Sequence, residues 1–251
     1  MGTRARCSTA SRVSARAIAC TSSFVPPPIS PAERRVDLSE LAHAIQNRLD
    51  AKNAARERAL PAARRSIRAS ANAIRAIHRL EFDAAKTLIA DSRAALDEGL
   101  AAVERHADIR HAGYLQDAQK EYAEANLTLA LVTDQDLPGP TDIDVEDAAY
   151  LGGMSDTIGE GRRRLLDLLR LGEVEQAERL LAAMEEMYGV LVTMDYPDAI
   201  TMNLRRATDV SRSLIEKTRG DLSISVVQKD LRDALDRHAA ELRGKSSSSG
   251  G

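Results

Sequence analysis

Apolar and small side chains recur at every third or fourth position from Val36 onward, the spacing that places them on one face of an α-helix. Three such stripes are clear: Leu60, Ala63, Ile67, Ser70, Ile74 and Ile77; Leu115, Ala118, Tyr122, Ala125, Leu129 and Val132; and Val174, Ala177, Leu181, Met184, Tyr188 and Leu191. Each stripe must be covered by another helix. The pattern therefore predicts an all-α fold of about seven helices in one bundle or superhelical layer.

Residues that cap or break helices divide this pattern into segments. Asp37 or Ser39 is a suitable N-cap for the first helix. Pro61 allows a kink or a fresh start, because proline is tolerated without cost only in a first helical turn. The expected helices cover about 37–49, the stripe around 60–77, 81–104, 108–132, 142–171, 173–194, 199–219 and 225–242, and the clearest loop covers 133–141.

Three features set the later boundaries. Gly172 and Gly220 stand just past the expected ends of two helices, the usual position of a glycine C-cap. Ser225, followed by Gln228 three residues later, has the spacing of a capping box for the last helix. The alternation of Leu222, Ile224 and Val226 also fits a short strand, which is the less favoured alternative. No repeat of fixed period is present, so we expect a globular fold and not a solenoid.

The helical pattern defines one domain over residues 36–243, within a chain of 251 residues. Residues 1–35 are rich in Arg and Ser and carry no acid before Pro31, so we expect either a disordered tail or an organellar transit segment. Residues 244–251, with four serines, are expected to form a flexible tail.

Composition supports the helical fold and limits the function. The chain has no Trp, only 3% aromatic residues and 29% charged residues, which disfavours a β-sandwich or barrel. No apolar run approaches the length of a membrane span, so we expect a soluble protein without a membrane partner. The two cysteines, Cys7 and Cys20, lie outside the helical domain. This fits a reducing, cytoplasmic location, or an organelle if residues 1–35 are a transit segment.

Common catalytic motifs are absent from the sequence. It contains no phosphate-binding loop, zinc-protease motif, nucleophile elbow or paired-cysteine motif. The five histidines are scattered, and we expect each to be a surface or helix-packing residue and not a ligand or base. They are His43, His78, His106, His111 and His238.

Arginines are dense between residues 56 and 79, where Glu57 is the only acid. Five of them share one helical face: Arg58, Arg65, Arg68, Arg75 and Arg79. Guanidinium groups pair readily with phosphates, so this face is a candidate nucleic-acid surface. Ion pairs with acids of a neighbouring helix are the equally open alternative. Because aromatic residues are few, binding would depend on phosphate charge more than on base stacking.

Two carboxylate pairs form the second candidate site. Glu121 and Glu124 are three residues apart and Asp156 and Glu160 are four apart, so each pair shares one face of its helix. Four oxygen donors on two facing helices would suit Mg²⁺, with Mn²⁺ as an alternative. Taken alone, such spacing is more often that of a solvated face, because the chain has 38 acidic residues.

Three segments containing these residues resemble the translin superfamily, and within it the catalytic branch of translin-associated factor X. The first is Gln119 to Ala125, which is similar to the Glu-Tyr-x-Glu-Ala motif of that branch. The second is Tyr150 to Glu160, similar to Tyr-Leu-x-Gly-x-x-Asp-x-x-Gly-Glu, and the third runs from Tyr196 through Arg205, Arg206 and Arg212 to Leu222. The arginine-rich segment 64–79 also resembles the first basic helix of the family. Lys120 and the run Arg162–Arg164 have no place in this pattern.

The resemblance implies a helical subunit that assembles into a hollow oligomer, usually an octamer, and binds single-stranded RNA or DNA inside it. It implies that Glu121, Glu124, Asp156 and Glu160 are both the catalytic and the metal-binding residues. It also adds Arg205, Arg206 and Arg212 to the candidate nucleic-acid-binding residues.

We therefore expect an Mg²⁺-dependent endoribonuclease that cleaves single-stranded RNA inside an oligomeric barrel. The expected assembly is a homo-oligomer, with an octamer favoured, or a hetero-oligomer with a translin paralogue. The first alternative function is a catalytically silent oligomer that only binds nucleic acid. The second is a helical scaffold whose arginines merely pair with acids.

Overall fold

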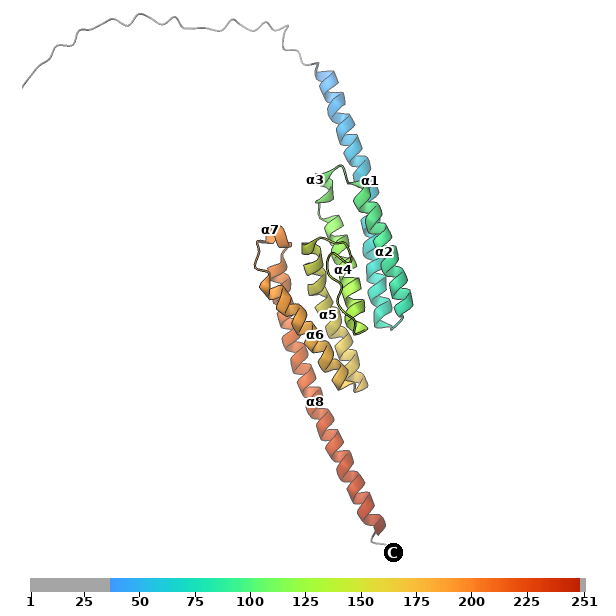
Figure 1. Ribbon diagram of the computed structural model, residues 1–251, viewed down its shortest axis with the longest axis vertical. Coiled ribbons are helices and arrows are strands. Elements are labelled where there is room, and N and C mark those ends of the chain that lie inside the picture. The colour runs from blue at the N-terminus through green and yellow to red at the C-terminus, as the bar shows by residue number, and fades with distance from the viewer. Residues whose placement is uncertain (1–36, 249–251) are drawn as a thin grey trace, which may run out of the picture. The chain divides into compact units, whose positions relative to one another are not determined.

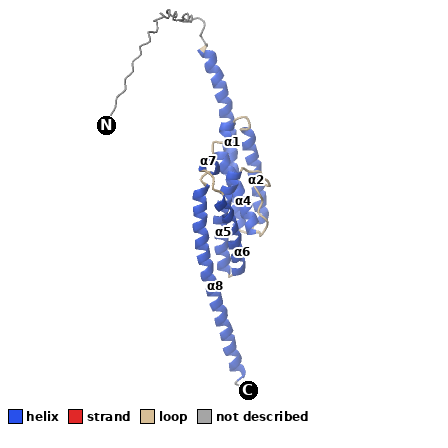
Figure 2. Cartoon of the chain, turned by 60° about the vertical axis from the view of Figure 1, so that its left-hand side comes forward, coloured by secondary structure: helices blue, strands red, loops and turns tan. Residues whose placement is uncertain are grey.

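The computed structural model describes residues 37–248, and over that range the chain forms eight helices and no strand (Figures 1 and 2). The expectation of an all-α fold is confirmed. By its internal contacts the chain divides into two units, residues 1–46 and residues 47–251. The predicted N-terminal tail lies outside the described residues. No described helix is both long and apolar enough to cross a membrane.

In the first unit, the described residues are the start of α1 (Leu38–His78). The carboxylate of Asp37 accepts a hydrogen bond from the backbone N–H of Ser39 at 2.9 Å, so Asp37 is the N-cap that the sequence suggested. Leu38, Leu41 and Ile45 follow at helical spacing, and all are exposed.

The second unit contains the rest of α1 and seven further helices. They are α2 (Phe82–Ala102), α3 (Ala107–Arg110), α4 (Tyr114–Val132), α5 (Asp147–Leu171), α6 (Val174–Thr193), α7 (Asp198–Thr201) and α8 (Leu204–Ser248). Helix α5 is central, because it packs against α4, α6 and α8, while α2 packs on the outer side of α4 (Figure 1). The described part of the predicted C-terminal tail, residues 244–248, belongs to α8.

Small side chains allow α1 and α2 to pack closely. Ala59, Ala62 and Ala63 of α1 are fully buried, and a Cβ atom added to Gly99 of α2 would lie only 3.0 Å from Cδ2 of Leu115 on α4, so the fit there is tight. A hydrogen-bonded group of three buried serines, Ser66, Ser70 and Ser92, joins the same two helices. This packing explains why α1 continues through Pro61. Of the two alternatives at Pro61, the fresh start is wrong, since the buried alanine face offsets the lost backbone hydrogen bond.

Beyond Pro61, two further expected helix boundaries are absent, and two unexpected ones appear. Gly220 lies inside α8, so the predicted helix end there is wrong. The hydroxyl of Ser225 donates to the carbonyl of Asp221 and does not cap a new helix, and the strand alternative at Leu222–Val226 is also wrong. Gly113, with φ of 97°, instead divides the predicted helix 108–132 into α3 and α4.

The second unexpected break separates α7 from α8 at Met202 and Asn203. Both have positive φ angles, 55° and 67°, a conformation that Asn tolerates but that is uncommon for Met. The predicted end at Gly172 is confirmed, because this residue terminates α5 with a φ of 81°.

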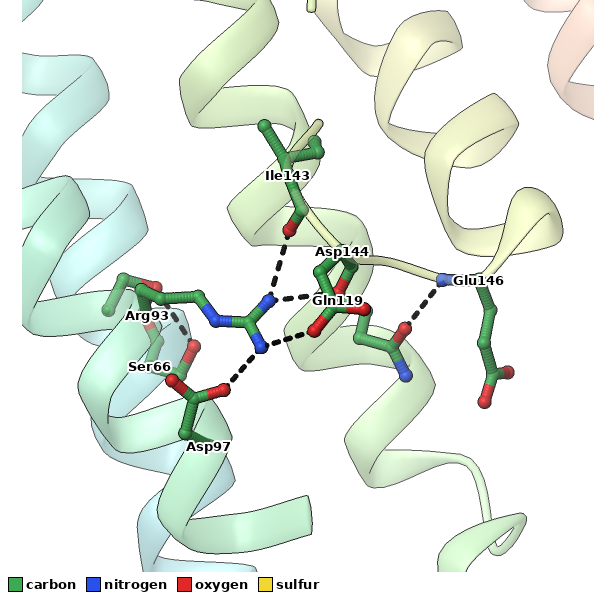
Figure 3. Close-up of polar contacts among 8 residues, drawn as sticks. Ser66, Arg93, Asp97, Gln119, Ile143, Asp144 and Glu146 are labelled. Carbon is green, nitrogen blue, oxygen red and sulfur yellow. Dashed lines mark hydrogen bonds and ion pairs between the residues drawn. The ribbon is translucent and has the colours of Figure 1, made fainter. Parts of the chain in front are cut away.

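Helix α5 begins later than predicted, at Asp147, because the carboxylate of Asp142 accepts from Gly139 in the preceding loop. Figure 3 shows how that loop is held. The guanidinium of Arg93 donates to the carbonyls of Ile143 and Asp144 at 3.0 and 2.9 Å. The side-chain oxygen of Gln119 accepts the N–H of Glu146, the residue before α5, at 2.8 Å. These bonds fix the start of α5 against α2 and α4.

Candidate functional site

A glycine sets the distance between the two helices that carry the candidate acids. A Cβ atom added to Gly153 of α5 would lie 2.7 Å from the carbonyl oxygen of Lys120 and 2.8 Å from the amide nitrogen of Glu124, both on α4. Such distances are too short for any side chain, so the two backbones can approach this closely only at glycine. Glu121 and Glu124 therefore face Asp156 and Glu160 across a narrow helix interface.

Glu124 is the most buried of the four acids, with 8% of its surface exposed. Burial is the main cause that raises the pKa of its carboxyl to about 8, and the negative charges of Glu121, Asp156 and Glu160 contribute to the same rise. The structure thus brings the four predicted acids together. Glu121, Asp156 and Glu160 each lie close enough to Glu124 to repel a negative charge on it. A cation placed among them would relieve this repulsion.

Lys120, which sequence reasoning could not assign, supplies one positive charge. Its Nζ lies 2.6 Å from the Oδ2 atom of Asp156 and 3.6 Å from the Oε1 atom of Glu121. Burial acts to lower the pKa of Lys120, but the hydrogen bond to Asp156 and the surrounding carboxylates outweigh it and leave the pKa raised. Lys120 is therefore held as an ammonium ion.

His78, the last residue of α1, contacts the fourth acid. Its Nε2 atom is hydrogen-bonded to Oε2 of Glu160, and this bond is the main reason that the pKa of Glu160 is lowered. The side chain of His78 is only 4% exposed, and its Nδ1 atom has no hydrogen-bond partner. From the sequence we expect only a surface or helix-packing residue here. The one available signal is its position beside Ile74 and Ile77 on the buried side of α1.

Three of the four acids line a cavity of about 530 Å³. From α4 and α5 it is lined by residues that include Lys120, Glu124, Asp156 and Glu160, and from the α7–α8 break and the start of α8 by residues that include Met202 and Arg206. Glu121 does not line the cavity itself, but it pairs with Lys120, which does. Arg206 is the only predicted nucleic-acid-binding residue that lines this cavity.

The other predicted arginines lie elsewhere on the surface. All five on α1 are exposed. Arg65 pairs with Glu98 at 2.5 Å and Arg79 with Glu81 at 2.8 Å, whereas Arg58 and Arg68 form no ion pair with a described residue. The ion-pair alternative therefore holds for only part of this face. On and near α8, Arg205 pairs with Asp195 and Arg212 donates to the hydroxyl of Tyr188.

The chemistry of the acidic cluster fits a hard divalent cation, because it offers four carboxylates and an excess of negative charge. The side chains as they lie are not yet arranged as ligands. Among the described residues, no three His, Cys, Asp or Glu side chains are grouped so as to hold a metal ion. Lys120 and His78 take the places beside Asp156 and Glu160 instead. Metal binding would require Lys120 to move.

Comparison with known proteins finds relatives of this chain in sequence and in structure. No family model matches the chain. An uncharacterized protein of Methanocaldococcus jannaschii is 31% identical over 204 residues, which cover 80% of this chain and 90% of that protein. The crystal structure of the translin-type complex AfC3PO superposes with a TM-score of 0.69 at 29% identity, over 74% of this chain and 97% of that one.

The chain belongs to the translin superfamily. Two further translin-type structures are similar to it. AfC3PO in complex with duplex RNA gives a TM-score of 0.68 at 28% identity, over 74% of this chain and 97% of that one. Apo-NeC3PO gives 0.65 at 18% identity, over 76% and 97%, and shares the fold. In this translin-superfamily chain the motifs quoted from the sequence lie on α4, on α5 and across the α7–α8 break, the elements that surround the acidic cavity.

Proposed function

We propose that the protein is an Mg²⁺-dependent endoribonuclease of the catalytic, translin-associated-factor-X type. The observation that carries the proposal is the convergence of four carboxylates, three of which line one cavity, with the pKa of Glu124 raised to about 8. So much negative charge, only partly neutralised by Lys120, disfavours the metal-free folded state and suits a divalent cation. RNA as the substrate is supported by the similarity to AfC3PO, which was solved in complex with duplex RNA.

In this proposal Glu121, Glu124, Asp156 and Glu160 hold Mg²⁺, or Mn²⁺ as an alternative. The metal, when bound, would neutralise charge on the phosphodiester and activate water for its hydrolysis. The protein's own groups position the reactants. Arg206, which lines the same cavity, would contact a phosphate, and His78 would hold the carboxylate of Glu160 in one orientation.

The strandedness of the substrate is a separate question. From the family resemblance we expect single-stranded RNA, yet the similar AfC3PO has been solved with a duplex. Cleavage of matched single-stranded and duplex RNAs under one set of conditions decides between them. Faster cleavage of the duplex would overturn the single-strand preference without affecting the metal site.

A hollow homo-oligomer, with the octamer favoured, or a hetero-oligomer with a translin paralogue, is the proposed assembly. Its support is apolar surface that the chain leaves uncovered: Leu38, Leu41, Ile45 and Leu49 on α1, and Ile224, Val227, Leu231 and Leu235 on α8, all at least 40% exposed. Light scattering should give a mass well above the 27.2 kDa of one chain. A monomer at micromolar concentration that still cleaves RNA would contradict an enclosed site.

A catalytically silent RNA-binding oligomer is the second candidate. The observation in its favour is that Lys120 and His78 already partner three of the four acids, Asp156, Glu121 and Glu160. Incubation of the full-length protein with labelled RNA, in the presence of Mg²⁺ or of a chelator, separates the two functions. We expect cleavage with Mg²⁺ and none with chelator. Cleavage that survives chelation would overturn the carboxylate–metal proposal, and no cleavage in either condition would favour the silent oligomer.

A further inference from the structure

Lys120 is placed among the acids by a second glycine. Its aliphatic chain lies over Gly152 of α5, where an added Cβ atom would come within 3.1 Å of the Lys120 Cγ and Cδ atoms. This packing directs the ammonium group to Asp156, at 2.6 Å, and Glu121, at 3.6 Å. The side chain thus stands where a cation shared by α4 and α5 would stand.

Lys120 also has space into which it can move. Besides the acidic cavity, it lines a second cavity of about 200 Å³ whose other residues include Gln116 and Asp117. Asp117 is three positions before Lys120 on the same helix, a spacing at which a Lys–Asp pair can form. His78 lacks this freedom, because its side chain is only 4% exposed against 34% for Lys120.

We propose that Lys120 is an internal counter-ion that competes with Mg²⁺ for Asp156 and Glu121, and that an RNA phosphate draws it away and so strengthens metal binding. The inference rests on the proposed function. Without RNA, Mg²⁺ must break the Lys120 ion pair and lie beside the ammonium group, which repels it. Both effects weaken the affinity of the site for Mg²⁺. A phosphate at the cavity offers Lys120 a new partner. Binding of RNA and of Mg²⁺ then favour each other, and by linkage the coupling is reciprocal.

The first test measures Mg²⁺ binding alone by isothermal titration calorimetry on the full chain. Lys120→Met keeps the length of the side chain and removes its charge, so we expect Mg²⁺ to bind about tenfold more tightly. Lys120→Arg keeps the charge and should bind Mg²⁺ as the parent does. The matched control is Lys52→Met, which breaks a Lys–Asp pair of the same 2.6 Å length on the surface, with Asp108. Equal Mg²⁺ affinity in the Lys120→Met variant and the parent would overturn the proposal, as would undetectable binding in that variant.

The second test uses the parent protein and remains valid even if Lys120→Met does not fold. A single-stranded oligoribonucleotide with 2′-O-methyl riboses serves as the RNA probe, and the Mg²⁺ titration is repeated in its presence. We expect the probe to tighten Mg²⁺ binding about tenfold in the parent, and to have little effect in Lys120→Met. An unchanged Mg²⁺ affinity in the parent would overturn the proposal.

The outcome also separates this inference from the proposed function. If cleavage requires Mg²⁺ but Lys120→Met leaves Mg²⁺ affinity unchanged, only the role of Lys120 is wrong. If cleavage persists with chelator, the metal-dependent function itself is wrong.

Discussion

Two regions of this molecule concentrate charge of one sign, and they differ in how far that charge is exposed to solvent. The arginine face of α1 is exposed, and Arg65 and Arg79 have acidic partners of their own. The acids between α4 and α5 lie at a cavity, where Glu124 is 8% exposed and its pKa reaches about 8. Water and salt screen like charges on an exposed helix, whereas buried like charges must be neutralised by a proton or a cation. The acidic cluster is therefore the stronger indication of a ligand.

The largest effect that this comparison predicts is on catalysis. Glu124→Gln keeps the size of the side chain but removes the central charge of the cluster, so RNA cleavage should fall by about 10²-fold or more, by analogy with loss of a key electrostatic group. RNA affinity should change little. The control is Glu178→Gln, which alters an exposed acid on α6. Parental cleavage rates in Glu124→Gln would show that the site is misassigned.

A pair of glycines tests whether the α4–α5 distance matters. Gly153→Ala should destabilise the protein by about 1–3 kcal/mol and reduce cleavage, because the new methyl group overlaps backbone atoms of Lys120 and Glu124. Gly189→Ala, on α6, meets no atom within 4 Å and should stabilise the fold by about 0.5–1 kcal/mol. Denaturant unfolding measures both changes. Equal effects of the two substitutions would refute the role given to Gly153.

The raised pKa of Glu124 predicts how stability depends on pH. Between pH 4.5, the ordinary value, and about 8, the folded state keeps a proton on Glu124 that the unfolded chain has lost. The free energy of unfolding therefore falls as pH rises through this range, by at most about 1.4 kcal/mol per pH unit from this group. Glu124→Gln should remove that fall. Without Mg²⁺, the melting temperature of Glu124→Gln minus that of the parent should be larger at pH 8 than at pH 5. The same difference at both pH values would contradict the burial of charge.

The smallest predicted effect concerns the arginines. Arg68→Ala combined with Arg75→Ala should lower the slope of log RNA affinity against log salt by about 1 to 2, since each arginine–phosphate pair on a single strand accounts for roughly 0.7 of that slope. Arg65→Ala with Arg79→Ala should lower it less, because Glu98 and Glu81 already neutralise these groups. If neither double substitution changes the salt slope, the α1 face does not bind nucleic acid.

Local signals in the sequence predicted much of this fold. Apolar spacing correctly indicated helices throughout the described residues, and Gly172 was correctly identified as a helix end. The fresh start expected at Pro61 and the helix end expected at Gly220 are wrong, because local propensity is outweighed where a helix packs against its neighbours. The break at Met202 and Asn203 carries no glycine or proline, and its one local signal is Asn203, a residue type that tolerates positive φ.

Helical spacing and the family resemblance predicted the members of the acidic cluster. Pairs at helical spacing located Glu121 with Glu124 and Asp156 with Glu160, but not their partners. His78 lies 82 positions from Glu160, and Lys120 lies 36 positions from Asp156. Contacts between residues so distant in the sequence depend on how helices pack, which residue spacing does not reveal.

The most direct test of the acidic cluster as a metal site is anomalous diffraction from crystals of the protein soaked in Mn²⁺. We expect an anomalous peak between α4 and α5, within about 2–2.5 Å of carboxylate oxygens of Glu124 and Asp156. The ammonium group of Lys120 should then have moved away from Asp156. A strong peak elsewhere, or the Lys120–Asp156 pair intact beside a cluster without Mn²⁺ at saturating concentration, would contradict the account.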